Sequence, residues 1–359
     1  MKKQAGFTLV EFLVAMGVTL LVTAAALSMF TDALRTNETV TLMSDMTDNL
    51  RTGMNLMVQD LIQVGTGIPT GGIPVPSGGS PSPPVNRPGP PATNYTFQVG
   101  STVLPAIEPG ANLGPQVTSP DAVPGPNTDI VTMLYADNSL ALDQDPINRT
   151  AAAGVTACNG TIAANGSTVT FDSNCVNLTA SNIRINPGDL IMFSNARGNV
   201  IQTVTDVAGQ TLSFGTSDAF NLNQRNDPSG TIKQLQSPAG SGTYPPTTAT
   251  RIWMITYYLD NTTDPQHVRL VRQVNFNPPQ PVGEVLENLQ VTYNFVDGAT
   301  NPSNQPTVPA GLSENQIRAV NVFLGARSTA TSTKTRKYLR TNLATQVSLR
   351  SMAYVSRYN

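Results

Sequence analysis

Near its start the chain reads GFTLVEFLVA (residues 6–15), the head of an apolar run that continues without proline to about Phe30. Lys2 and Lys3 precede the run, and Glu11 is the one charged residue within it. At a rise of ~1.5 Å per residue, about 24 apolar residues form a helix long enough to cross a bilayer. A carboxylate in bilayer hydrocarbon is unfavourable by roughly 2.5–3.5 kcal/mol. The sequence therefore predicts a membrane-spanning helix in which Glu11 needs a partner.

The position of Gly6 distinguishes this segment from an ordinary secretory signal. In a secretory signal the small residues of the cleavage site follow the apolar core. Here Gly6 precedes the core, so cleavage after it would leave the whole apolar helix on the mature chain. A basic leader, a glycine and then FTLVE (residues 7–11) resemble the leader of the type IV pilin family. The resemblance implies that a prepilin peptidase cuts between Gly6 and Phe7 and methylates the new amine. An uncleaved anchor with a chance glutamate is the alternative.

The same resemblance gives Glu11 a role in subunit assembly. As the fifth residue of the mature chain, Glu11 is expected to face the terminal ammonium group of a neighbouring subunit. An unpaired carboxylate in an apolar helix bundle is strongly disfavoured, and a neighbouring cation removes that penalty. This pairing would set the axial stagger between subunits.

The composition is typical of a β-rich protein outside the cytoplasm. The 359 residues have a net charge of −2 and only 12% charged residues, with 28 glycines and 28 prolines. The net charge gives no argument for a nucleic-acid partner. One histidine and two cysteines do not favour a conventional zinc site, and no cofactor is expected.

A single helix is predicted for residues 7–64, following a leader of residues 1–6, with residues 7–30 in the membrane. In its second half apolar residues recur at steps of three and four, which places them on one helical face. Glycines and a proline after residue 64 end the helix. We expect this stripe to pack against a globular domain, with its methionines as core residues. The stripe consists of Met43, Met46, Leu50, Met54, Met57, Leu61 and Val64.

The rest of the chain divides into a proline-rich region and a β-rich domain. Residues 65–127 hold more than half of the prolines and are expected to form largely an exposed loop, with a short strand near residues 95–99. Residues 128–359 predict an antiparallel β-rich pilin domain with large inserted loops, which makes the fold class α+β. Its strands are expected at 129–135, 189–194, 200–207, 211–214, 251–259, 268–274, 287–296, 317–324 and 343–354.

The last third extends the resemblance. VLENLQVTY (residues 285–293) followed by IRAVNVFLGARS (residues 317–328) resembles the PilW-type minor pilins and, more distantly, the J-type pseudopilins of type II secretion. This implies a minor pilin and no enzyme, held in the inner membrane before it enters the periplasmic and extracellular pilus. Its implied partners are other minor and major pilins, the prepilin peptidase, the inner-membrane assembly platform, and membrane lipid before assembly. The large inserted loops favour a subunit that primes assembly or lies near the tip.

Two clusters outside the helix are candidate sites. Cys158 and Cys175 enclose a loop of about 17 residues, where a disulfide would contribute on the order of 3 kcal/mol, with free thiols as the alternative. Asp137, Asp143 and Asp145 could bind Ca²⁺ through oxygen ligands. Their spacing does not match an EF-hand, and solvated turn residues are the simpler interpretation.

Basic residues gather near the C-terminus, where no acid follows Glu314. The segment KTRK (residues 334–337) lies between two predicted strands and is interpreted as a solvated hairpin tip. Contact with DNA phosphates or with an acidic partner subunit is the alternative. A DNA-binding pilin used in uptake and a type II secretion pseudopilin are therefore the other candidate functions. His267 has no nucleophile motif beside it and is expected to be satisfied or exposed.

Overall fold

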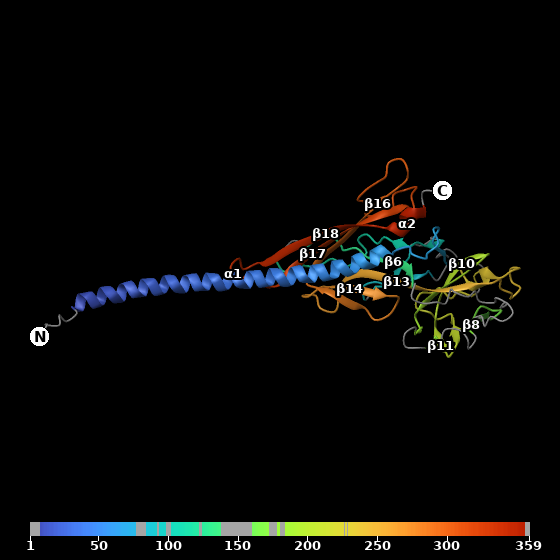
Figure 1. Ribbon diagram of the computed structural model, residues 1–359, viewed down its shortest axis with the longest axis horizontal. Helices are drawn as coiled ribbons and strands as arrows, with labels where there is room; N and C mark the ends of the chain where they lie inside the picture. The colour runs from blue at the N-terminus through green and yellow to red at the C-terminus, as the bar shows by residue number, and fades with distance from the viewer. Residues whose placement is uncertain are drawn as a thin grey trace, which may run out of the picture.

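The protein consists of a β-rich body from which one long helix projects (Figure 1). A computed structural model describes residues 8–76, 84–91, 93–97, 102–121, 124–137, 160–171, 178–179, 184–225, 227 and 229–355. Helix α1 spans Leu9–Gln63, and the remaining regular elements are almost all antiparallel strands. This arrangement confirms the predicted α+β class. Residues 1–7, which include Gly6 and Phe7, lie outside the described residues.

Helix α1 has one exposed half and one buried face. Its first half contacts no other part of the described body, and side chains such as Leu21 are 73% exposed. In its second half the predicted stripe is buried from Met46 to Leu61, whereas Met43 is 48% exposed. The helix ends one residue before the predicted position, and Gly65 follows with a φ of +79°.

The largest sheet contains seven strands centred on β13, Thr248–Asp260. Ile252 pairs with both Leu190 and Ala136, and Ile255 pairs with both Met133 and Val274. Strands β9 and β14 therefore follow each other along one edge of β13, and β6 occupies the other edge. The other strands of this sheet are β5 (Ile107–Glu108), β6 (Val131–Ala136), β9 (Leu190–Asn195), β10 (Gly198–Thr203), β14 (Arg269–Val274) and β15 (Gln280–Glu284).

A three-stranded sheet covers the opposite side of α1. It is formed by β16 (Leu286–Phe295), β17 (Ile317–Thr331) and β18 (Tyr338–Ser348) in that order. In Figure 1 the second half of α1 lies between β17–β18 and β14. The main core forms there, where the buried helix face meets inward-facing residues of both sheets, and alternation along β16 and β17 supplies those residues.

A smaller sheet lies at the end of the body farthest from the exposed half of α1 (Figure 1). Its order is β11-β12-β8-β7, and it packs with β9 and β10 around a second core that includes Phe193 and Phe214. The predicted strand at 200–207 is divided between β10 and β11, and the chain turns from β11 to β12 at residues 209–210. The four strands are β7 (Gly160–Ile162), β8 (Thr168–Phe171), β11 (Asp206–Ala208) and β12 (Thr211–Ser213).

The prediction that residues 65–127 form largely an exposed loop is wrong for much of the part that the structure describes. Ile73, Val85, Leu104 and Ile107 are fully buried or nearly so. Short strands pair across this region, because single apolar residues between prolines pack individually against the large sheet. Besides β5, these strands are β1 (Ile73–Pro74), β2 (Asn86–Arg87), β3 (Tyr95–Thr96) and β4 (Val103–Leu104).

The predicted final strand at residues 343–354 is correct only in its first part. Strand β18 ends at Ser348, and helix α2 follows at Arg350–Val355. The chain turns there because Leu349 and Met352 are buried beside the end of α1, where a Cβ on Gly65 would lie 3.0 Å from the Cγ of Met352. The short helix thus closes the main core.

Candidate assembly site

Glu11 closes a capping box at the first turn of α1. The Thr8 hydroxyl and the Thr8 backbone N–H both donate to Oε2 of Glu11, each at 2.9 Å. The Glu11 N–H donates in return to Oγ1 of Thr8 at 3.4 Å. Thr-x-x-Glu is the sequence signature of this cap, so Thr8 and Glu11 carry a signal for it in the sequence. The carboxylate therefore has a local role in starting the helix.

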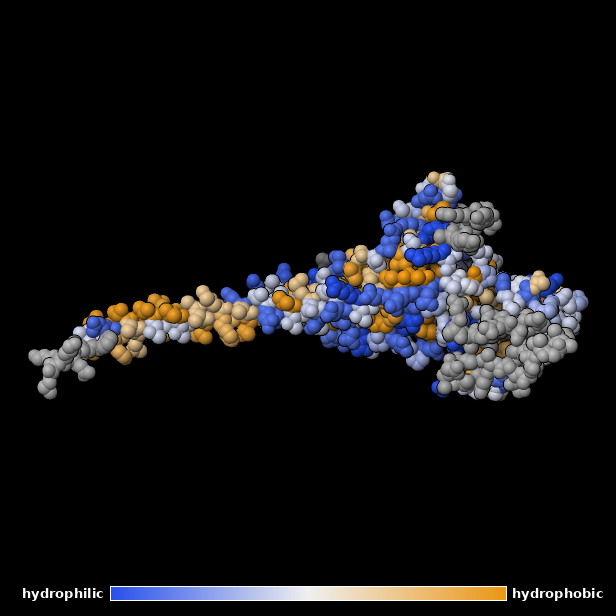
Figure 2. Space-filling view, in the orientation of Figure 1, coloured by the Kyte–Doolittle hydropathy of each residue, from blue (hydrophilic) through white to orange (hydrophobic). Residues whose placement is uncertain are grey.

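The second carboxylate oxygen of Glu11, Oε1, takes no part in this cap. Oε1 accepts no hydrogen bond from any residue that the structure describes. Its neighbours Leu9 and Phe12 are exposed. Figure 2 shows the apolar surface of the projecting helix in orange. A carboxylate on such a surface, with one oxygen outside the cap, can accept an ammonium group from another molecule.

The exposed half of α1 is suited to an apolar environment. Within the described ranges, α1 is the helix that is long and apolar enough to cross a membrane. The most apolar part of α1 is not buried inside the body. Contiguous apolar surface of this extent is unfavourable in water and requires lipid or other apolar helices.

Asp60 fixes the other half of α1 to the body and is only 3% exposed. Arg272 donates to it twice, from Nε to Oδ2 at 2.7 Å and from Nη2 to Oδ1 at 3.0 Å. The hydroxyls of Tyr257 and Tyr135 donate to the same carboxylate at 2.6 and 3.1 Å. One helix side chain is thus held by β6, β13 and β14 together. The sequence places Asp60 largely off the apolar stripe, and its burial was not predicted.

The two tyrosines remain hydrogen-bond donors over the physiological pH range. Burial, and next the negative charge of Asp60, raise the pKa of Tyr135 to about 12. The same two causes raise the pKa of Tyr257 still further. All four donors to Asp60 are therefore protonated, and the carboxylate is fully paired inside the body.

Of the three aspartates considered as Ca²⁺ ligands, the structure describes Asp137. Asp137 forms an ion pair with Arg251. Nε of Arg251 donates to Oδ2 of Asp137 at 2.8 Å, and both side chains are buried. Asp189 lies 3.9 Å from the same guanidinium. Asp143 and Asp145, like Cys158 and Cys175, lie outside the described residues. Within the described ranges no three His, Cys, Asp or Glu side chains form a cluster that could hold a metal ion.

His267 and the basic segment both lie in exposed turns of the body. Nδ1 of His267 lies 2.8 Å from Oδ2 of Asp264 in the exposed turn between β13 and β14. The segment KTRK (residues 334–337) is the exposed turn of the β17–β18 hairpin. Arg340 in that hairpin pairs with Glu287 at 2.8 Å and with Asp121.

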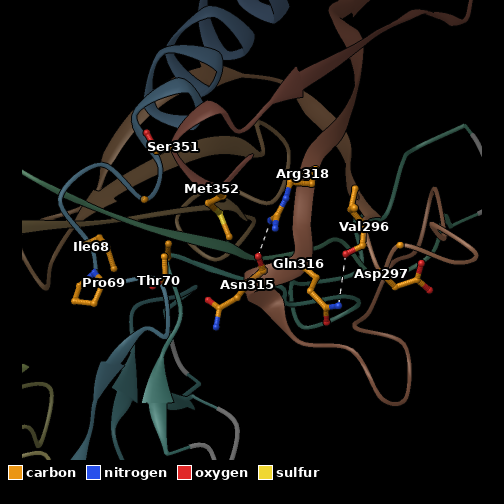
Figure 3. A pocket seen from close by; sticks show the side chains of 13 residues that line it. Ile68, Pro69, Thr70, Val296, Asp297, Asn315, Gln316, Arg318, Ser351 and Met352 are labelled. Carbon is orange, nitrogen blue, oxygen red and sulfur yellow. Dashed lines mark hydrogen bonds between the residues drawn. The ribbon is translucent and has the colours of Figure 1, made fainter. Parts of the chain in front are cut away.

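A hollow of about 420 Å³ lies beside the end of α1 (Figure 3). Ile68, Val296 and Met352 line it together with Arg318, whose guanidinium extends towards Met352 and the backbone carbonyl of Asn315 in Figure 3. Nη1 of Arg318 donates to that carbonyl at 2.6 Å, while its Nε is buried without a partner among the described residues. Among the residues that the structure describes, no His or Cys lines the hollow.

Comparison with known proteins adds a match at the amino terminus. Residues 1–27 match the family model for the prokaryotic N-terminal methylation motif. No curated protein and no solved structure matches the chain. The matched residues include Gly6, Phe7 and Glu11 and the first part of the exposed apolar helix, which fits membrane anchoring of a pilin or pseudopilin that a prepilin peptidase processes. Such a motif suggests a structural protein. The chain carries a prepilin-type amino terminus, which supports its assignment to a type IV pilin-like family.

Proposed function

We propose that this protein is a minor pilin of a type IV pilus, cleaved between Gly6 and Phe7 and incorporated into the filament through α1. The observation that carries the proposal is a methylation motif on a 55-residue helix whose first half is exposed and apolar. The second half is fixed in a β-rich body through Asp60. A helix built in this way can leave lipid and pack against other apolar helices without changing the body.

Glu11 supplies the specificity of that transfer. In the membrane, the Thr8 hydroxyl and N–H satisfy Oε2 and reduce the penalty of the buried charge. In the filament, Oε1 accepts the methylated ammonium of Phe7 from a neighbouring subunit. A subunit out of register would leave both charges unpaired in apolar surroundings, which disfavours incorrect staggers.

The shape of the body favours a priming or tip position over the shaft. The small sheet β11-β12-β8-β7 extends the body away from α1 (Figure 1). A repeating shaft packs its globular domains closely, and such an extension would clash with the next subunit along. At the tip the same extension points away from the other subunits.

The protein is then found in two places in succession, first the membrane and then the pilus. It starts in the inner membrane, where lipid, the prepilin peptidase and the assembly platform are its partners. It continues in the periplasm and the extracellular pilus, in contact with other minor and major pilins. A pseudopilin of type II secretion would use the same helix and the same Glu11, and loss of secretion with intact pili in a deletion strain would favour that function.

Sheared pili from cells carrying tagged variants test the proposal. We expect wild-type protein in both the membrane and the sheared filaments, and Glu11→Ala protein in the membrane alone. Asp48→Ala is the matched control, because Asp48 is an exposed acid on the same helix within the body. Equal amounts of Glu11→Ala and wild-type protein in the filaments would contradict the assembly role.

A further inference from the structure

The β17–β18 hairpin is the part of the body that lies nearest to the exposed half of α1. In Figure 1 it runs along α1 and extends beyond the other strands towards the apolar half. Its turn is attached to the helix, since the Thr333 hydroxyl donates to Oε2 of Glu38 and the hydroxyls of Ser332 and Thr39 lie 3.4 Å apart. The height of the turn along the helix axis is therefore fixed.

That height lies a few ångströms outside the headgroup layer of a bilayer spanned by α1, a gap that helix tilt and long side chains can close. The apolar run ends near Phe30, about eight residues before Glu38, which is ~12 Å along the axis at ~1.5 Å per residue. The polar headgroup layer occupies roughly 5–7 Å on each side of the hydrocarbon. A helix tilt of ~20°, the average for membrane helices, brings one side of the body closer to the lipid. Long Lys and Arg side chains extend the reach of the turn further.

The turn also carries a net positive charge, because three cations stand beside the single carboxylate of Glu38. Lys334, Arg336 and Lys337 are exposed, and none forms an ion pair with an acid that the structure describes. The arginines in the stem differ, because Arg327 and Arg340 both pair with Glu287. The charge of the hairpin is thus concentrated at its membrane-proximal end.

The backbone holds these cations in a defined turn. The N–H of Arg336 donates to the carbonyl of Ser332 at 2.7 Å, and the N–H of Ser332 donates to the carbonyl of Lys337 at 3.0 Å. Arg336 adopts a φ of +54°, which tightens the turn. Three cations within four residues therefore project from one fixed point.

We propose that residues 334–337 bind the phosphates of anionic phospholipid headgroups while α1 is in the membrane. This contact orients the body on the bilayer before the subunit is extracted, and it is broken on assembly. The inference rests on the proposed membrane insertion of α1. Duplex DNA is the weaker candidate, because proteins that bind DNA through its backbone commonly contact 6–10 phosphates. Each cation held close to the bilayer is attracted by the negative surface potential of anionic lipids, so a small cluster fixed there favours the lipid contact.

Photo-cross-linking in proteoliposomes tests this contact. The full-length chain is reconstituted with phosphatidylglycerol that carries a photoreactive headgroup, and cross-linked peptides are mapped by mass spectrometry. We expect cross-links at residues 332–338 of the wild type. Their yield should fall about fivefold or more in the triple Gln variant, which combines Lys334→Gln, Arg336→Gln and Lys337→Gln. High salt should lower the yield of the wild type similarly. The charge-keeping variant Lys334→Arg, Lys337→Arg should cross-link like the wild type.

Two controls separate the possible failures. Resistance of the chain to alkaline extraction measures insertion of α1, so an extractable chain would overturn the proposed anchoring together with the headgroup contact. Full insertion with unchanged cross-links in the triple Gln variant would overturn the headgroup contact alone. If the triple variant loses a duplex DNA gel shift while its lipid cross-links persist, the segment is a DNA contact and the lipid proposal is wrong.

Discussion

Asp60 on α1 and Arg272 on β14 form a two-point ion pair inside the body, with N–O distances of 2.7 and 3.0 Å. The pair joins the last turns of the helix to the large sheet, and two tyrosine hydroxyls complete the shell of the carboxylate. The pair adds to the apolar stripe from Met46 to Leu61 and to the contact of Glu38 with the β17–β18 turn, which also fix α1 to the body. The connection between anchor and body is thus chemically specific as well as apolar.

Asp60→Asn should destabilise the body by about 3 kcal/mol, because it leaves the Arg272 guanidinium without a counter-charge in a mostly buried place. Chemical denaturation followed by near-ultraviolet circular dichroism measures the change. Asp48→Asn, an exposed acid on the same helix, should stay within about 0.5 kcal/mol of the wild type. A loss for Asp60→Asn as small as that of the control would mean that the ion pair does not hold the helix.

Thr8→Val should fray the start of α1, since it removes the hydroxyl that exchanges hydrogen bonds with Glu11. Loss of such a cap costs about 1 kcal/mol, which corresponds to roughly fivefold faster amide exchange at the first turn. Hydrogen exchange on the protein in detergent micelles measures this, and Thr8→Ser should retain most of the protection. Equal exchange in Thr8→Val and wild type would show that the cap does not form in an apolar environment.

Glu108 should make the body less stable as the pH rises. Burial raises the pKa of this side chain to about 7, against the partial opposition of the nearby Arg87. In the unfolded chain Glu108 titrates near 4.5, so stability from its neutral form is complete below pH 4.5 and is lost as the pH rises to about 7. Glu108→Gln should therefore gain stability relative to wild type between pH 5 and 8, by on the order of 2–3 kcal/mol. Parallel stability curves for the two proteins would refute the raised pKa.

Periodic patterns in the sequence predicted the elements that are long and locally determined. The steps of three and four from Met46 to Leu61 are a property of the helix alone, and so are the alternating residues of β16 and β17. The strands at 251–259 and 268–274 were likewise predicted, and they correspond to parts of β13 and β14. In each case the decisive residues are close together in the chain.

The missed features depend on partners that are distant in the chain. Ile73 pairs with Leu104 in a two-residue ladder, which is too short to show a period. Burial of Asp60 becomes favourable only when Tyr135, Tyr257 and Arg272 converge on it from three strands. The cap on Glu11, in contrast, was readable from Thr8, three residues earlier.

Mass spectrometry of the mature chain tests the central claim most directly. Protein purified from its native membrane should begin at Phe7 and carry a methyl group on the new amine, and Gly6→Val should abolish both changes. That result would establish the processing on which a filament role for Glu11 depends. A mature chain that still begins at Met1, in cells with an active prepilin peptidase, would contradict the account and leave a tethered β-rich body.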